Sequence, residues 1–151
     1  MKTIASFTVD HDRLLPGLYV SRKDGDVVTY DLRFIRPNTP PFLPNPVMHT
    51  IEHLAATYVR NSRFGSEIVY FGPMGCRTGF YLLMRTQNHE RALEKVKEAL
   101  RKTTDAPEMF GASRKECGNY KELSIEAAHK EAARYLEQLE SREQDFKYPT
   151  E

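Results

Sequence analysis

The spacing of apolar residues along the chain predicts four strands and three helices. Two runs rich in β-branched and aromatic residues flank Asp24-Gly25, a pair typical of a tight hairpin turn. Apolar residues at helical spacing indicate three amphipathic helices further along the chain. The predicted strands cover residues 18–22, 27–35, 67–71 and 79–85, and the predicted helices cover residues 46–61, 88–102 and 124–139.

Three segments lie outside these elements. Residues 3–12 alternate imperfectly and are expected to form an extended arm or a short strand. Residues 36–46 are rich in proline, so they predict a stiff loop that ends with Asn45 as the N-cap of the following helix. Residues 141–151 are polar and are expected to fray.

Composition limits the class of protein. At 151 residues, with 40% hydrophobic and 28% charged residues, we expect residues 1–151 to form a single globular domain. A formal net charge of +1 argues against binding to nucleic acid through phosphate neutralisation. No run approaches the roughly 18 apolar residues of a membrane span, and the first residues lack the apolar stretch of a signal peptide. We therefore expect a cytoplasmic protein without membrane or nucleic-acid partners.

The first predicted helix contains His49-Thr50-Ile51-Glu52-His53. Two histidines four residues apart lie on one face of a helix, close enough to bind one divalent metal ion. This face is opposite the one that carries Val47, Ile51 and Leu54, so the histidines point away from the core. The order H-x-x-E-H is that of the inverzincin peptidases, and a tetrahedral site needs at least one further protein ligand.

Other residues have two interpretations each. Cys76 lies in a glycine-rich loop beside Arg77, whose positive charge would favour a reactive thiolate, but a small buried hydrophobic residue is the alternative. Cys117 lies before Gly118 in a loop that could reach the two histidines, although the spacing is too long for a local zinc motif. Arg33 lies in the middle of a strand, where it either has a partner or an anionic ligand or lies on an exposed face. Ser6 and His11 belong to the N-terminal arm, where solvated residues are the simpler interpretation.

Six blocks together resemble the S-ribosylhomocysteine lyase (LuxS) family, in the same order and over roughly residues 3–140. They are Ser6-Phe-Thr-Val-Asp-His11, Tyr30-Asp-Leu-Arg33-Phe, Pro37-Asn38, His49-Thr-Ile-Glu-His53-Leu, Pro73-Met-Gly-Cys76-Arg-Thr-Gly79 and Glu116-Cys117-Gly. The resemblance implies an α+β fold with an antiparallel β-sheet packed against α-helices, which agrees with the predicted order of elements. It also implies a homodimer with active sites at the subunit interface.

The resemblance further implies what the residues do. The family cleaves S-ribosylhomocysteine to homocysteine and 4,5-dihydroxy-2,3-pentanedione, the precursor of the autoinducer-2 quorum-sensing signal, as part of the activated methyl cycle. The reaction consists of metal-assisted aldose-ketose isomerisation and β-elimination. The metal would be Fe²⁺, replaceable by Zn²⁺ or Co²⁺. The implied roles are metal ligation by His49, His53 and Cys117, acid-base catalysis by Glu52 and Cys76, and substrate binding by Ser6, His11 and Arg33.

The chain departs from the family pattern in two places. Tyr70-Phe71-Gly72 replaces the acidic residue and Ile-Ser that many relatives carry before Pro-Met-Gly-Cys, and Arg36 stands where relatives often have glutamine. The first change concerns sugar recognition. Two other functions fit the histidine motif: an inverzincin-type metallopeptidase in which Glu52 activates a water, and a structural metal domain completed by His11 or His89.

Overall fold

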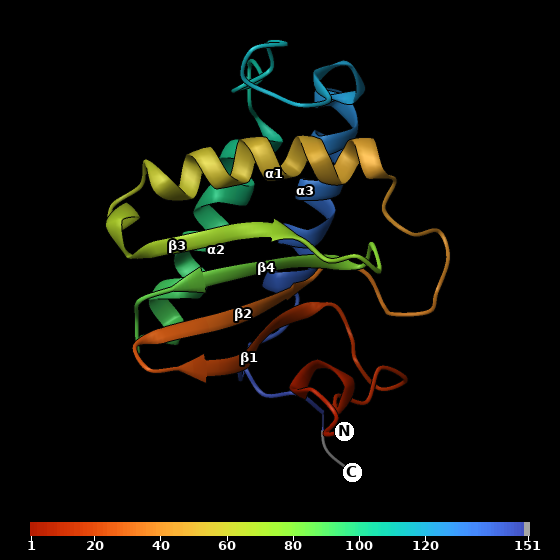
Figure 1. Cartoon of the computed structure of the whole chain (residues 1–151), viewed down its shortest axis with the longest axis vertical. Coiled ribbons are helices and arrows are strands. Elements are labelled where there is room, and N and C mark those ends of the chain that lie inside the picture. Colours follow the sequence, from red (N-terminus) through yellow and green to blue (C-terminus); the bar gives the residue numbers. More distant parts are fainter. Residues whose placement is uncertain (150–151) are drawn as a thin grey trace.

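The computed structural model describes residues 1–149 and shows a four-stranded antiparallel sheet with three α-helices (Figure 1). The strand order is β1-β2-β4-β3. The predicted α+β class is confirmed, with each predicted strand and helix present within a few residues. The strands are β1 (Gly17–Asp24), β2 (Val27–Arg33), β3 (Ile68–Pro73) and β4 (Gly79–Met84), the helices are α1 (Asn45–Arg60), α2 (His89–Thr104) and α3 (Ile125–Glu140), and the 3-10 turns are η1 (Ala5–Phe7), η2 (Gly65–Glu67) and η3 (Tyr120–Glu122).

The β1–β2 hairpin closes at the predicted turn. Asp24 pairs with Val27, and Gly25 between them has a φ of +61°, a conformation that glycine adopts without steric cost. The register then places Gly17 opposite Arg33. On its other side β2 pairs with β4, and there Arg33 lies opposite Gly79, the first residue of β4.

The two faces of β2 carry different kinds of side chain. Val28, Tyr30 and Leu32 point into the hydrophobic core and are at most 2% exposed. Asp31 and Arg33 alternate with them on the other face, yet they are only 1% and 3% exposed. The interpretation of Arg33 as part of an exposed sheet face is therefore wrong, and the interpretation that it has a partner is confirmed by its ion pair with Asp31.

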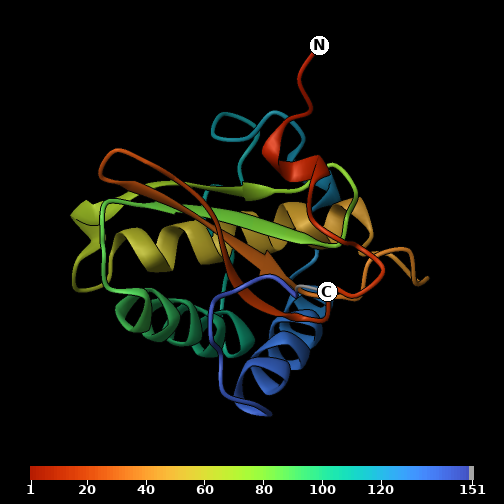
Figure 2. The same ribbon diagram turned by 90° about the horizontal axis from the view of Figure 1, so that it is seen from below.

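The helices cover one face of the sheet (Figure 2). Helix α2 packs against α1 and α3, α1 lies along β3, and α3 reaches β1. Asn88 caps α2 as predicted, because its side chain accepts a hydrogen bond from the backbone N–H of Arg91. Helix α1 differs from the prediction: Asn45 is its first residue and Pro44 is the N-cap, so the cap makes no side-chain hydrogen bond.

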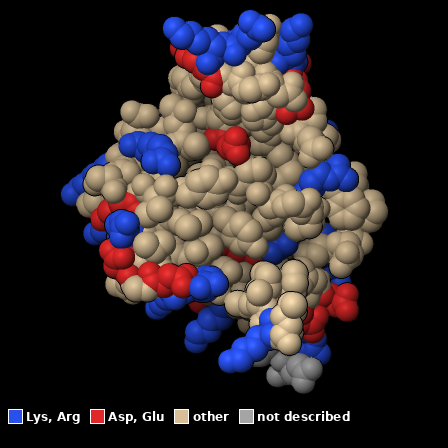
Figure 3. Space-filling view, viewed as in Figure 1, with Lys and Arg blue, Asp and Glu red and all other residues tan. Residues whose placement is uncertain are grey.

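The opposite face of the sheet carries none of the three described helices (Figures 1 and 2). Seen from this side, the molecular surface is largely uncharged over the strands, and Lys, Arg, Asp and Glu gather around its border (Figure 3). Val69 and Tyr70 of β3 are 37% and 51% exposed, respectively.

Both ends of the chain differ from the prediction. Residues 3–12 form a 3-10 turn and bends instead of a strand, because they do not pair with the sheet. Residues 141–149 are packed and not frayed: Gln144 is 6% exposed and accepts a hydrogen bond from the backbone N–H of Leu18. The last two residues of that predicted tail, 150 and 151, lie outside the described residues. Among the described helices, none has the length and apolar character that crossing a bilayer requires.

Candidate functional site

Helix α1 presents His49 and His53 side by side, as its spacing predicts. Their ring centroids are 4.7 Å apart in an edge-to-face arrangement, and both side chains are half-buried. Glu52 is also half-buried and precedes His53 on the same helix. The core-facing side of α1 is filled by residues such as Ile51 and Leu54, which are fully buried. The histidine face is therefore left for a ligand or a neighbouring segment.

The segment between α2 and α3 brings Cys117 to these histidines. Its thiol Sγ lies 3.4 Å from His49 Nε2, and the ligand atoms of His49, His53 and Cys117 all lie within 4.8 Å of one another. The backbone N–H of Cys117 donates to the Ser113 carbonyl, which holds the loop that carries the thiol. The predicted approach of Cys117 to the histidine pair is confirmed.

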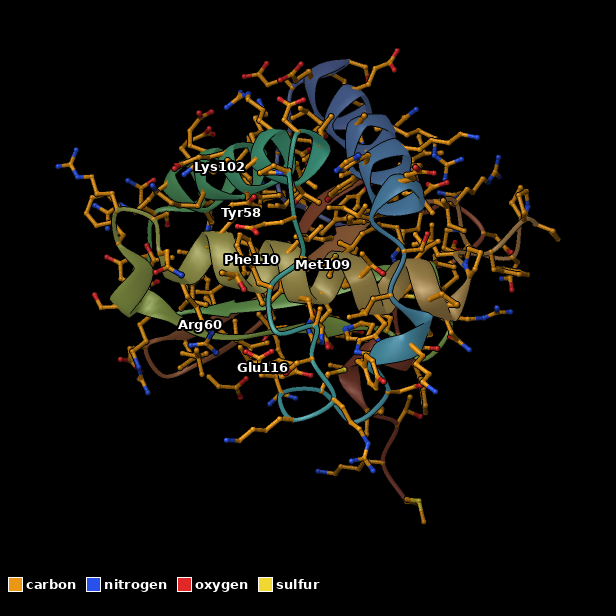
Figure 4. All side chains as sticks on the ribbon, turned by 90° about the horizontal axis from the view of Figure 1, so that it is seen from above. Tyr58, Arg60, Lys102, Met109, Phe110 and Glu116 are labelled. Atoms are coloured by element: carbon orange, nitrogen blue, oxygen red, sulfur yellow. The ribbon has the colours of Figure 1, made fainter. Side chains whose placement is uncertain are left out.

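The remaining ring nitrogens are occupied by protein groups. His49 Nδ1 lies 2.6 Å from Glu122 Oε1, and His53 Nδ1 lies 2.9 Å from the Phe110 carbonyl oxygen. Figure 4 shows the segment of Met109 and Phe110 running across α1. With both Nδ1 atoms hydrogen-bonded, the two Nε2 atoms are the free ligand atoms, which is the usual arrangement of metal-binding histidines.

The donor set fits a tetrahedral metal. Metal–nitrogen distances of about 2.0 Å and a metal–sulfur distance of about 2.3 Å place the ligand atoms of such a site about 3.5 Å apart. The observed 3.4 Å between Cys117 Sγ and His49 Nε2 matches this separation. Three protein ligands leave the fourth position for water or substrate, which is typical of catalytic rather than structural sites.

Gly111 fits closely against this centre. It has a φ of +62°, and a Cβ atom at this position would lie 3.3 Å from His53 Nδ1. A side chain here would be strained by the backbone and would press on the ligand. Glycine at position 111 therefore lets the segment approach His53 closely enough for the His53 ring to hydrogen-bond to the Phe110 carbonyl.

Cys76 lies in the turn between β3 and β4, and its side chain is exposed. The interpretation of Cys76 as a buried hydrophobic residue is thus wrong. Its Sγ lies 3.0 Å from the Thr78 hydroxyl and 3.9 Å from Nη1 of Arg33. Arg77 was expected to supply the positive charge, but its guanidinium lies over the ring of Phe42. The cation beside the thiol is Arg33, which strand pairing places next to this turn.

Arg33 is held in position by a buried ion pair. Its Nε and Nη2 donate to the two carboxylate oxygens of Asp31 at 3.1 and 2.6 Å, and its Nη1 donates to Thr78 at 2.8 Å. Burial alone would lower the pKa of Arg33, but the hydrogen bonds and charge of Asp31, with a smaller contribution from Cys76, raise it above its usual value. A permanent positive charge therefore faces the thiol.

The N-terminal arm closes over this turn. Ser6, His11, Arg33 and Cys76 line one pocket of about 220 Å³, and Nδ1 of His11 is hydrogen-bonded to the Val9 carbonyl. The interpretation of Ser6 and His11 as merely solvated residues is therefore wrong. The lining of the pocket does not include the histidine–cysteine group or Glu52. Within the described residues of one chain, the predicted site residues thus form two groups.

These positions bear on the two alternative functions. A peptidase of the inverzincin type would need a downstream glutamate as third ligand, whereas the third candidate ligand here is Cys117 and Glu122 contacts the far side of His49. A structural site would need His11 or His89 as fourth ligand. His11 lies in the pocket with Cys76, and His89 is hydrogen-bonded to the hydroxyl of Tyr30.

Several supporting residues escaped the sequence reasoning. Asp31 and Arg33 are two apart on one strand, so their shared face and opposite charges could have indicated a pair. Glu122 left no such signal, because its partner His49 is 73 residues away in the sequence. The hydrogen bond of Thr78 to Arg33 also spans 45 residues and left none. The contact of Tyr148 with Asp31 has no signal in the sequence either, because the polar composition of residues 141–151 predicts a frayed tail.

Comparison with known proteins adds to this geometry. The family model of S-ribosylhomocysteinase (LuxS) matches residues 4–146. An S-ribosylhomocysteine lyase of Phocaeicola vulgatus is 50% identical over 159 residues, covering 99% of this chain and 99% of the relative. An S-ribosylhomocysteine lyase of Borreliella afzelii is 46% identical over 157 residues, covering 99% of this chain and 100% of the relative. An S-ribosylhomocysteine lyase of Clostridium beijerinckii is 44% identical, with 99% coverage of both chains.

Proposed function

The chain belongs to the S-ribosylhomocysteinase (LuxS) family and is therefore a carbon–sulfur lyase that acts on S-ribosylhomocysteine, and we propose which of its residues perform each step. The reaction moves the ribose carbonyl along the sugar and then eliminates homocysteine, leaving 4,5-dihydroxy-2,3-pentanedione. The observation that carries the assignment is the convergence of His49, His53 and Cys117, whose ligand atoms lie within 4.8 Å of one another while both Nδ1 atoms are held by other groups.

We assign the metal ligands to these three residues and the metal to Fe²⁺, with Zn²⁺ or Co²⁺ as substitutes. Imidazole and thiolate donors suit all three ions. When bound, the ion acts as a Lewis acid that polarises the carbonyl oxygen of the sugar. Glu122 and the Phe110 carbonyl fix the two imidazole rings, so the ligand atoms are already oriented before the ion arrives.

We assign the proton transfers of isomerisation to Cys76. In each of two successive isomerisations its thiolate removes a proton from the hydroxyl-bearing carbon next to the carbonyl and returns it to the former carbonyl carbon, while the hydroxyl proton passes to the former carbonyl oxygen. The carbonyl thus moves by two positions in all, to the carbon from which elimination can break the carbon–sulfur bond. The guanidinium of Arg33 lies 3.9 Å from the sulfur, and Thr78 supplies a hydroxyl at 3.0 Å.

Elimination is assigned to Glu52. Its carboxylate takes the proton next to the final carbonyl, the carbon–sulfur bond breaks, and homocysteine leaves as a thiolate. Support comes from its place on α1 immediately before His53, one of the three residues that would hold the metal. Ser6, His11 and Arg33 are assigned to holding the ribosyl group, because all three line the pocket that contains Cys76.

We propose that the enzyme is a homodimer with active sites at the subunit interface. None of the helices in residues 1–149 lies over one face of the sheet, and this face is mostly uncharged (Figure 3), so a second copy could cover it. Phe7 of the N-terminal arm is 73% exposed and is also available for such contact. Equilibrium sedimentation that finds only monomers at micromolar concentration would contradict this proposal.

We also propose a cytoplasmic location and a single-domain organisation. Two free cysteines that must stay reduced support a cytoplasmic enzyme. One hydrophobic core shared by the sheet and all three helices supports a single domain over residues 1–151.

Thiol release tests the proposed function. The Fe²⁺-loaded protein is incubated anaerobically with S-ribosylhomocysteine, and released homocysteine is titrated with a thiol reagent after removal of the protein. We expect turnover by the wild type, none by Cys76→Ala with its metal retained, and loss of metal from Cys117→Ser. Absence of thiol release from the metal-loaded wild type would refute the function, and full metal content in Cys117→Ser would refute the ligand assignment.

A further inference from the structure

The C-terminal segment is bound along the first strand of the sheet. The Phe146 carbonyl accepts a hydrogen bond of 2.8 Å from the backbone N–H of Val20, and Phe146 forms a parallel bridge with Tyr19. Gln144 accepts from the backbone N–H of Leu18. These contacts direct the next residues of the segment across β1 toward the pocket that contains Cys76.

Tyr148 completes that pocket. Its ring stacks on Tyr19 with centroids 5.2 Å apart, and it is one of the residues that line the pocket. Its hydroxyl donates a hydrogen bond of 2.7 Å to Oδ2 of Asp31. The same oxygen accepts from Nη2 of Arg33, so the tyrosine and the arginine share one carboxylate oxygen.

We propose that Tyr148 is a positioning residue for catalysis, which acts through Asp31 to hold Arg33 against the Cys76 thiol. The contacts form one continuous chain from the hydroxyl of Tyr148 to the carboxylate, then to the guanidinium, and finally to the thiol 3.9 Å away. The proposal rests on the role of Cys76 given above, and it extends the site by a residue that does not touch the reacting atoms.

Burial makes this hydrogen bond consequential. The side chains of Asp31 and Arg33 are 1% and 4% exposed, so the carboxylate depends on protein donors rather than on bulk water. Without the hydroxyl, the carboxylate has one donor fewer and attracts Arg33 more strongly, away from the thiol. Burial, together with the negative charge of Asp31, raises the pKa of Tyr148, so the hydroxyl keeps its proton and remains a donor at neutral pH.

The variant Tyr148→Phe removes the hydroxyl and keeps the ring that stacks on Tyr19. Tyr135→Phe is the control, because the Tyr135 hydroxyl also donates a hydrogen bond, of 2.8 Å, to a protein acceptor, but this acceptor is the Gly17 carbonyl and not Asp31. The Tyr135 bond is fully buried and the Tyr148 bond is partly buried, so we expect Tyr135→Phe to lose at least as much melting temperature as Tyr148→Phe. A merely structural role for Tyr148 would make the two variants alike in every other measurement.

The readout is the rate at which iodoacetamide alkylates Cys76 in the metal-loaded protein, followed by mass spectrometry of tryptic peptides. Cys117 lies on a different tryptic peptide and serves as an internal reference. We expect Tyr148→Phe to slow alkylation of Cys76 about fivefold, equivalent to about 1 kcal/mol, and to lower kcat/KM by a similar factor. Tyr135→Phe should leave both rates near those of the wild type.

Each outcome has a defined meaning. Equal Cys76 alkylation rates in Tyr148→Phe and Tyr135→Phe would overturn the proposal, whether both are slowed or neither is. The alkylation rate does not depend on turnover. If the wild type releases no thiol from S-ribosylhomocysteine but Tyr148→Phe still slows alkylation, the proposed function fails while the positioning by Tyr148 stands.

Discussion

Glu122 binds the far side of a candidate metal ligand, so its removal should weaken metal binding without removing a ligand. Its Oε1 lies 2.6 Å from His49 Nδ1, and the two side chains are 28% and 18% exposed. The carboxylate accepts the Nδ1 proton, fixes the tautomer with Nε2 toward the metal, and makes that nitrogen a better donor. Glu122→Ala leaves the imidazole free to rotate and to exchange tautomers.

The magnitude follows from the geometry of this hydrogen bond. A partly buried hydrogen bond to a charged group contributes about 1.5 to 3 kcal/mol, and loss of such an outer partner lowers metal affinity about 10- to 100-fold. Glu122→Gln keeps a neutral acceptor in reach of Nδ1, so its affinity should lie between those of the wild type and Glu122→Ala. The expected order of affinity is therefore wild type, Gln variant, Ala variant.

Competition with a chromophoric chelator measures the affinity for Zn²⁺, and the absorption of bound Co²⁺ reports whether the ligand set is intact. Glu126→Gln is the control, because Glu126 is exposed in the first turn of α3. It removes the same charge from the same part of the chain. Equal Zn²⁺ affinity in Glu122→Ala and the control would refute the reasoning that Glu122 orients His49.

Two further predictions concern the metal centre and acid stability. Gly111→Ala should lose about 1 to 2 kcal/mol of stability, because its φ is +62°, and should also bind metal more weakly, because the new Cβ lies 3.3 Å from His53 Nδ1. Gly25→Ala is the control, because it has the same backbone strain but open space around the new Cβ, so it should lose stability without a change in metal affinity. Equal Zn²⁺ affinities in these two variants would contradict the prediction. Burial lowers the pKa of His89 from 6.5, and its Nδ1 lies 2.7 Å from the Tyr30 hydroxyl. Because the unfolded state then takes up this proton at higher pH than the folded state, the free energy of unfolding should fall as pH drops through about 6.5. Denaturant unfolding of His89→Gln at several pH values should show a shallower fall. An unchanged dependence of the free energy of unfolding on pH would exclude His89 as a cause.

The local elements were predictable because local geometry determines them. Alternation of apolar residues placed β2 and its two faces, and the 3.6-residue period placed His49 and His53 on the outer side of α1. The turn at Asp24-Gly25 was predictable because glycine readily adopts a positive φ. The N-cap of α2 was predictable because the side chain of Asn88 accepts a backbone hydrogen bond. The larger errors fell where no periodic pattern exists, at residues 3–12 and 141–149, and a smaller one at the N-cap of α1, which is Pro44 and not Asn45.

The contacts that make up the site required the tertiary structure. Cys117 comes 64 residues after His53, and no local pattern relates the two; the packing of α2 and α3 against α1 brings the loop between them to the histidines. Pairing of β2 with β4, not sequence proximity, put Arg33 instead of Arg77 beside Cys76. The sequence by itself determined two candidate ligands on one helix face and the elements around them. Long-range packing decided the third candidate ligand, the partners of the imidazoles and the cation at the thiol, because these contacts depend on how the core assembles and leave no periodic trace in the chain.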